Sequence, residues 1–250
     1  MHHEFRHALV IGASSGIGAA IARRLADDGA RVGLVARRRA ALERVVDDIN
    51  QRAGGERALA RVHDVRNAEA APELLQTIAR DLGGLDLVVY AAGVMHRMAF
   101  DEFDPDKEID MLRVNLAGAV AWLGPAAERF SRLGRGAIVG IGSVAGDRGR
   151  TGNPAYGASK AGLHTYLEAL RNRVARDGVG VVTVKPGFVD TAMTRDLDGL
   201  FWVISPDRAA EIILRHARRG ATCVYVPARW RLVMAVIRSI PSFIFRRLEV

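Results

Sequence analysis

Short apolar runs alternate along the chain with longer stretches whose apolar positions recur every three or four residues. The continuous runs have the length and β-branched content of buried strands, and the periodic stretches between them indicate helices. Strands are predicted over residues 8–12, 31–36, 58–63, 85–91, 136–143, 180–186 and 222–227. Because strands separated by helices must return to the same edge of a sheet, this alternation predicts a parallel sheet.

The predicted architecture is an α/β fold of one domain. Right-handed crossovers between seven parallel strands give a Rossmann-type doubly wound sheet flanked by helices, with ligands at the carboxyl ends of the strands. The 250 residues, 49% of them hydrophobic, suit a single domain, and no linker or repeat interrupts them. We assign residues 1–227 to this domain and residues 228–250 to a basic amphipathic C-terminal tail that is not an independent domain.

A glycine-rich turn follows the first predicted strand. Gly12, Gly16 and Gly18 lie between that strand and a helical pattern over residues 19–28. Such a turn lets the backbone approach a pyrophosphate, and the helix start presents free N–H groups to it. A tight turn that only requires positive φ angles is the alternative for an isolated glycine triplet.

Tyr156 and Lys160 provide candidate proton chemistry. Residues four apart share one helix face, so both side chains can project into one cleft. A nearby ammonium favours the phenolate and lowers the pKa of the tyrosine, which then serves as a general acid or base. Ser143, at a strand end, can hold a substrate carbonyl beside the phenol. The four-residue spacing alone has low specificity, so the order of the surrounding motifs must decide whether Tyr156 and Lys160 are catalytic.

Together these motifs resemble those of the short-chain dehydrogenase/reductases. The resemblance covers residues 6–227 and rests on the glycine turn, Asp64-Val65, Ala92-Gly93, Asn115, Ser143, Tyr156-x-x-x-Lys160 and Pro186-Gly187. It implies that Tyr156 is the catalytic acid or base, that Ser143 orients the carbonyl, and that Lys160 binds the nicotinamide ribose. It also implies that Asn115 lies on a kinked helix and holds a water in the proton relay.

Two positions depart from the family pattern. Ile11 stands where the family often has threonine, and Tyr90-Ala91 replaces the usual Asn-Asn. Both positions are mainly structural, so they put local strand bonding in doubt rather than the chemistry.

The resemblance also implies a set of cofactor contacts. Asp64 and Val65 are expected at the adenine, and the segment from Pro186 is expected at the nicotinamide carboxamide. Asp64 could instead cap the turn after its strand. The full set of expected cofactor-binding residues is Gly12, Ser14, Ser15, Gly16, Ile17, Gly18, Arg37, Arg38, Asp64, Val65, Ala92, Gly93, Tyr156, Lys160, Pro186, Gly187, Val189 and Thr191.

The end of the second predicted strand favours NADP(H) over NAD(H). Enzymes that use NAD carry an acidic residue there for the ribose hydroxyls. This chain has Arg37-Arg38-Arg39, whose guanidinium groups can bind the extra phosphate of NADP. A solvated helix start is the alternative role for these arginines.

Residues 192–204 lie where the family places a substrate-binding lid. Their apolar side chains indicate an apolar substrate, although an amphipathic helix that only covers the core would show the same pattern. The apolar members are Met193, Leu197, Leu200, Phe201, Trp202 and Val203.

The C-terminal tail is basic and amphipathic. It carries five arginines against the single Glu249, which is half of the formal net charge of +8. Such a stretch suits an anionic membrane surface or a lipid-phosphate substrate, while subunit packing is the alternative. The tail is also similar to that of decaprenylphosphoryl-2-keto-erythro-pentose reductases, which reduce a keto-sugar carried on a polyprenyl phosphate.

Several classes of function find no support in the composition. The basic residues do not form a nucleic-acid-binding module, and no histidine has metal-ligand spacing, so we predict neither nucleic acid nor metal. His96 and His164 are expected near the cleft in solvated or satisfied polar roles, with contact to a substrate as the alternative. Cys223 is expected as a small buried residue, with a reactive thiol as the alternative. The start lacks the apolar core of a signal peptide, and no run would span a membrane. The expected location is cytoplasmic, with peripheral contact at the inner face of the membrane as an option.

The resulting prediction is an NADPH-dependent carbonyl reductase that acts on a small-molecule or lipid-linked ketone. Two other enzymes remain open, a reductase of 3-oxoacyl groups on an acidic carrier protein and a small-ketone reductase. A non-catalytic NADP-binding sensor or scaffold is the alternative of another class. The family resemblance implies a homodimer or homotetramer built on the helix that carries Tyr156 and on its neighbour.

Overall fold

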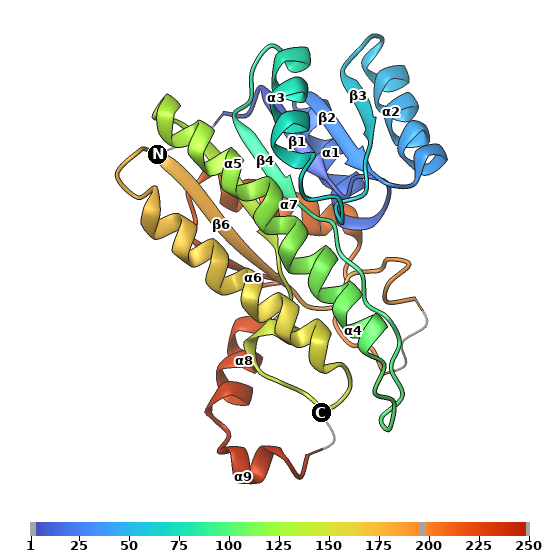
Figure 1. Ribbon diagram of the computed structural model, residues 1–250, viewed down its shortest axis with the longest axis vertical. Helices are drawn as coiled ribbons and strands as arrows, with labels where there is room; N and C mark the ends of the chain where they lie inside the picture. The colour runs from blue at the N-terminus through green and yellow to red at the C-terminus, as the bar shows by residue number, and fades with distance from the viewer. Residues whose placement is uncertain (1–3, 196–198, 249–250) are drawn as a thin grey trace.

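A seven-stranded parallel sheet forms the centre of the protein (Figure 1). The computed structural model describes residues 4–195 and 199–248. All seven predicted strands are present with ends within two residues of those expected. They are β1 (His7–Ile11), β2 (Arg31–Ala36), β3 (Ala58–Val62), β4 (Leu87–Tyr90), β5 (Gly136–Ile141), β6 (Val179–Pro186) and β7 (Cys223–Val226).

The helices form a layer on each face of the sheet. The apolar sides of α1, α2 and α7 pack on one face. Those of α3, α5 and α6 pack on the other, where Figure 1 shows α5 and α6 in front of β6. The bounds are α1 (Gly16–Asp27), α2 (Arg39–Ala53), α3 (Ala71–Leu82), α4 (Pro105–Leu112), η1 (Arg113–Ala117), α5 (Gly118–Leu133), η2 (Val144–Asp147), α6 (Pro154–Arg173), α7 (Pro206–Arg218), α8 (Trp230–Ser239) and α9 (Ser242–Phe245).

The strand order β3-β2-β1-β4-β5-β6-β7 confirms the doubly wound prediction. The chain first builds outward from β1 through β2 to β3, then returns to the other side of β1 and continues through β4 to β7. The connections after β1 and β4 therefore leave the sheet in opposite directions. This reversal opens a crevice at the carboxyl ends of the central strands, where such folds bind ligands.

The C-terminal tail folds as two short helices at one end of the molecule. Figure 1 shows α8 and α9 below the sheet, with α9 at the lower tip of the long axis. Trp230 and Met234, on the inner side of α8, form a small apolar cluster with Val144. Throughout the ranges given above, the helices are too short or too polar to cross a bilayer.

One sequence prediction about the last strand is wrong. Cys223 is exposed rather than buried, because it is the first residue of β7, which lies at the edge of the sheet. Its neighbours Val224 and Val226 point into the core instead.

Candidate active site

A cleft of about 470 Å³ opens at the carboxyl ends of the central strands. It brings together segments that are far apart in the sequence: the glycine turn after β1, the ends of β2 and β3, and the loops after β4, β5 and β6. Every residue expected to bind the cofactor lines it, as do Ser143, Tyr156 and Lys160. Asn115 is not on the wall and lies fully buried.

The glycine turn is pressed against its neighbours so closely that side chains are excluded. Gly12 has a φ of +90°, and a Cβ there would meet the backbone nitrogen of Ala92 at 2.4 Å. A Cβ on Gly18 would lie 2.3 Å from the carbonyl oxygen of Gly12. The turn therefore holds α1 directly against β1 and leaves the N-terminal end of that helix facing the cleft, as binding of a phosphate anion requires.

Arg38 lies across the serines of this turn. Its guanidinium Nη2 donates to Ser14 Oγ at 2.9 Å and to Ser15 Oγ at 2.6 Å. Arg37 and Arg38 are both exposed on the cleft. Two cations beside the glycine turn create a positive rim at the end of β2.

Tyr156 lies on the first turn of α6 and faces Ser143. The Asn153 side chain caps this helix by accepting a hydrogen bond from the Tyr156 backbone N–H at 3.1 Å. Burial raises the pKa of the Tyr156 phenol, while its hydrogen bond with Ser143 acts in the opposite direction. The pKa of Tyr156 is therefore raised, whereas we expected Lys160 to lower it. The loss of water around the phenol raises the pKa more than the hydrogen bond with Ser143 lowers it.

Lys160 is a buried cation. Its side chain is 4% exposed, and Nζ donates to the Ile141 carbonyl oxygen at 3.0 Å. Burial lowers its pKa to about 8. One carbonyl satisfies only one of the three ammonium donors. The remaining donors are available to hydroxyl groups of a ligand in the cleft.

Asn115 is held in a π-helical segment, η1, between α4 and α5. Its side chain bonds both backbone groups of Val94, accepting from the N–H at 2.8 Å and donating to the carbonyl at 3.0 Å. It also donates to Ser159 Oγ at 3.0 Å. The expected kink is thus a local widening of the helix, which turns the amide toward the loop after β4.

Tyr90 explains one departure from the family pattern. Its hydroxyl donates to the Val114 carbonyl oxygen at 2.5 Å, inside η1. The π-helical geometry disrupts the regular ladder of backbone bonds. Tyr90 therefore joins the end of β4 to the segment that holds Asn115, a role that the sequence alone did not reveal.

Asp64 has a partner within the cleft wall. Its carboxylate accepts from the Arg66 backbone N–H at 3.0 Å and from the Arg66 guanidinium at 2.9 Å. The first bond is the turn-capping alternative, which the structure shows directly. The same guanidinium binds Asp110 and, with His96, lowers the pKa of that carboxyl to about 2.

A buried polar network supports Ser143 from behind. The Ser143 backbone N–H donates to His164 Nε2 at 3.4 Å. Asp147, in η2, binds Lys185 Nζ at 2.5 Å and accepts from the Tyr225 hydroxyl at 2.7 Å. Burial, together with the nearby Lys185, lowers the pKa of His164 to about 3. This histidine is therefore neutral near pH 7 and acts as an acceptor, which agrees with its expected polar role.

The loop after β6 contacts the C-terminal tail. A Cβ on Gly187 would lie 1.9 Å from the Trp230 indole nitrogen, so the Trp230 ring, at the start of α8, packs directly on this loop. The same indole packs against Phe188 and Phe201, with ring centroids 5.5 and 5.2 Å away. The tail therefore forms part of the wall beside the cleft. Leu197, one of the expected lid residues, lies outside the described residues.

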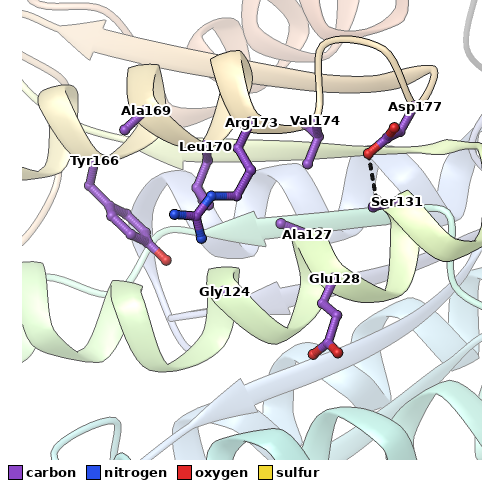
Figure 2. Close-up of a pocket in the computed structure, with 10 residues that line it drawn as sticks. All are labelled: Gly124, Ala127, Glu128, Ser131, Tyr166, Ala169, Leu170, Arg173, Val174 and Asp177. Carbon is purple, nitrogen blue, oxygen red and sulfur yellow. Dashed lines mark hydrogen bonds between the residues drawn. The ribbon is translucent and has the colours of Figure 1, made fainter.

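A second and larger hollow, of about 600 Å³, lies away from the catalytic side chains. Figure 2 shows it as a groove between α5 and α6, with Glu128 and Ser131 on one helix and Tyr166 and Arg173 on the other. None of the expected site residues lines it. We therefore place the candidate active site in the smaller cleft, where the reactive groups converge.

Comparison with known proteins agrees with this geometry. A family profile described as short chain dehydrogenase matches residues 6–199. An oxidoreductase of uncharacterised activity from Myxococcus xanthus is 33% identical over 242 residues, 96% of this chain and 95% of its own. One from Streptomyces coelicolor is 34% identical over 246 residues, 98% and 96% of the two chains.

A solved structure gives the same result. A variant of actinorhodin polyketide ketoreductase, solved with NADPH, is 28% identical and superposes with a TM-score of 0.79 over 90% of this chain and 97% of its own. The matched profile ends before the tail, and these relatives lend no support to its likeness to the keto-sugar reductases. With a matching profile, two full-length relatives and the convergent cleft, the chain belongs to the short-chain dehydrogenase family and is an oxidoreductase.

Proposed function

We propose that this oxidoreductase uses NADPH to reduce a ketone to a secondary alcohol. The observation that carries the proposal is the convergence of Ser143, Tyr156 and Lys160 in one cleft with a glycine turn that excludes side chains. The serine hydroxyl acts to lower the pKa of the phenol, and the ammonium lies on the same helix face. This is the arrangement needed to deliver one proton to one fixed oxygen atom.

The residues of the cleft fit a dinucleotide. The turn at Gly12 and Gly16 leaves room for a pyrophosphate at the start of α1. The spare donors of Lys160 suit ribose hydroxyls, and the loop from Pro186 to Thr191 provides backbone groups for a carboxamide. When bound, a reduced nicotinamide supplies the hydride for the carbonyl carbon.

Ser143, Tyr156 and Lys160 position the carbonyl oxygen and transfer the proton to it. Ser143 holds the carbonyl oxygen by a hydrogen bond, so negative charge that develops there meets a donor already in place. Tyr156 donates its phenolic proton to that oxygen. Lys160, protonated near pH 7, stabilises the phenolate that remains. In the oxidation direction the same groups accept the proton.

The preference for NADPH rests on the positive rim at the end of β2. Arg37 and Arg38 are exposed there, and Arg38 already spans Ser14 and Ser15. A guanidinium group favours a ribose 2′-phosphate, for which a carboxylate at this place would be repulsive. The related polyketide ketoreductase was solved with NADPH, which supports the same choice. Replacement of Arg38 by Asp should shift the preference toward NADH.

The substrate that we propose is an apolar or lipid-linked ketone. The rings of Phe188, Phe201 and Trp202 stand beside the cleft in contact with Trp230, and Met193 is part of the cleft wall. A keto-sugar on a polyprenyl phosphate belongs to this class. Such a substrate would place the enzyme at the cytoplasmic face of a membrane.

We also propose a homodimer or homotetramer that uses the groove between α5 and α6. The groove is open to solvent along two helices, and Val120 on α5 is 42% exposed. Small residues on both walls, Gly124 and Ala169, would let helices of a second copy approach closely (Figure 2).

Replacement of Tyr156 by Phe tests the reaction. The variant keeps the ring and loses the proton, so we expect NADPH to bind within about twofold of the wild-type affinity while ketone reduction falls by at least about 10³-fold. Fluorescence titration measures the first quantity and NADPH oxidation with a panel of ketones the second. Binding without turnover in the wild type would favour the sensor, and salt-sensitive reduction of carrier-linked ketones alone would favour the carrier-protein enzyme.

A further inference from the structure

The outward side of the C-terminal tail is apolar and exposed, and none of the residues that the structure describes covers it. On α8, Trp230 and Met234 face inward and are buried, at 2% and 0% exposure. Leu232 and Val236, one turn apart on the opposite side, are 75% and 64% exposed. A surface helix of a globular domain normally carries polar residues there, so α8 presents apolar residues on both sides.

The exposed apolar residues continue beyond α8. After Pro241 the chain turns into α9, where Phe243 is 61% and Ile244 is 42% exposed. Leu248 follows at 38%. We call Leu232, Val236, Phe243, Ile244 and Leu248 the tail face. Figure 1 shows that α8 and α9 form the lower end of the molecule, where all five of these side chains are exposed.

Arg148 anchors this tail to the catalytic domain. Its guanidinium Nη1 donates to the carbonyl oxygens of Ile237 at 2.5 Å and Ile240 at 2.6 Å, at the C-terminal end of α8. The same group lies 3.9 Å from the ring centroid of Phe245. These contacts satisfy carbonyls that the helix leaves unpaired and fix the angle between α8 and α9. The tail face is therefore held in one orientation.

The charge around the tail face selects its partner. Arg231, Arg238, Arg246 and Arg247 are all exposed on the same two helices. Within residues 228–248 there is no acidic residue. In a symmetric contact with a second copy, the same patch would meet itself and bring arginines together, which like charges oppose. Anionic headgroups would instead neutralise the arginines, while acyl chains cover the apolar residues.

We infer that the tail face docks the enzyme on an anionic lipid surface. The inference concerns binding alone and does not depend on the proposed reaction. The other strongly exposed aromatic residues, Phe100 and Phe103, lie beside Asp101 and Asp104, whose charge would repel such a surface. They are not part of the docking surface, and they provide a matched control.

Flotation of the full chain with lipid vesicles tests the inference. We expect the wild type to float with vesicles of phosphatidylcholine containing about one third phosphatidylglycerol, and not with phosphatidylcholine alone. The Leu232→Ser, Val236→Ser double variant should lose at least about tenfold in affinity. An Arg231→Gln, Arg238→Gln variant should lose roughly 25-fold at low salt, since each arginine near such a surface contributes about fivefold.

The Phe103→Ser variant is the control, because it removes a large apolar side chain that is even more exposed, at 89%, from the acidic loop. It should float like the wild type. Thermal unfolding and NADPH titration of all variants show whether they are folded, since every replaced side chain is exposed. The inference is overturned by a wild type that does not float, or by tail variants that float as well as it does. Light scattering that shows loss of a dimer in the Leu232→Ser, Val236→Ser variant, without flotation of the wild type, would assign the face to a second copy and also overturn it.

Discussion

At the residue scale, the cleft depends on a few positions where the side chain is fixed by space or by charge. Gly12 and Lys160 are the clearest examples. Gly12 must have no side chain, because the backbone of Ala92 lies too close for a Cβ. Lys160 carries its ammonium group in a buried position, where little water solvates the charge. Each leads to a measurable consequence.

Replacement of Gly12 by Ala should destabilise the protein more than replacement of Gly29 by Ala. Both glycines have a positive φ, +90° and +96°, so each variant pays about 1–2 kcal/mol for the backbone conformation. Only at Gly12 does a Cβ meet backbone atoms, whereas nothing lies within 4 Å of a Cβ at Gly29. Urea unfolding should show a larger loss for Gly12→Ala. Equal losses would mean that the turn can move.

The affinity for NADPH should fall as the pH rises above about 8. Burial lowers the pKa of Lys160 to about 8 in the cofactor-free protein, so the ammonium is present below this value and lost above it. Ribose hydroxyls accept hydrogen bonds from the charged form, so binding is favoured on the acid side. Fluorescence titration between pH 7 and 9.5 should show the weakening. In Lys160→Met the affinity should be lower throughout and lack this step.

At the element scale, the π-helical segment between α4 and α5 is the least regular part of the site. A hydrophobic pattern predicts strands and helices because burial repeats with a fixed period, and all seven strands followed from it. It carries no signal for one extra residue in a helical turn. The bonds of Asn115 to Val94 and of Tyr90 to Val114 depend on that extra residue. The family resemblance indicated the kink, and only the coordinates showed what holds it.

Tyr90→Phe should test this support. The variant leaves the Val114 carbonyl without its partner inside the protein, which costs about 1–3 kcal/mol of stability. Because η1 also positions Asn115, we expect a lower kcat with little change in the KM for NADPH. Denaturant unfolding and steady-state kinetics measure the two effects. A change in KM alone would argue that Tyr90 acts elsewhere.

Other local features also escaped the sequence for physical reasons. The pKa of Tyr156 depends on how much water reaches the phenol, and residue spacing along α6 does not contain that information. Cys223 belongs to an apolar segment, but its exposure depends on the position of β7 at the sheet edge. The contact of Trp230 with Gly187 joins residues distant in sequence, and no periodicity predicts it.

At the scale of the whole molecule, the sheet separates two surfaces. The cleft lies at the carboxyl ends of the strands, whereas the groove of Figure 2 runs along α5 and α6 on one face. An assembly that uses the groove would leave the cleft and the tail face free. If the three proposals hold, substitutions in one of these regions would alter assembly, catalysis or lipid binding without changing the other two.

Replacement of Ala169 by Arg should disrupt oligomer formation without affecting catalysis or lipid binding. Ala169 is exposed on the α6 side of the groove, and a long charged side chain there would keep a second pair of helices away. Size-exclusion chromatography with light scattering should show a smaller assembly, a monomer from a dimer or a dimer from a tetramer, while circular dichroism shows that the variant is still folded. Ala158→Arg, at another exposed position of α6 outside the groove, serves as the comparison. An unchanged assembly in Ala169→Arg would place the interface elsewhere.

The indole of Trp230 connects the C-terminal tail to the cleft, because it packs on Gly187 in the cleft wall. Trp230 contacts Gly187 in the loop after β6 and also packs against the rings of Phe201 and Trp202. Under the proposed function, sequence changes near the carboxyl terminus would alter which ketones are accepted while Ser143, Tyr156 and Lys160 stay the same. Within a family that shares one chemistry, substitutions from Trp230 onward, about the last twenty residues of the chain, would be one route to new substrates.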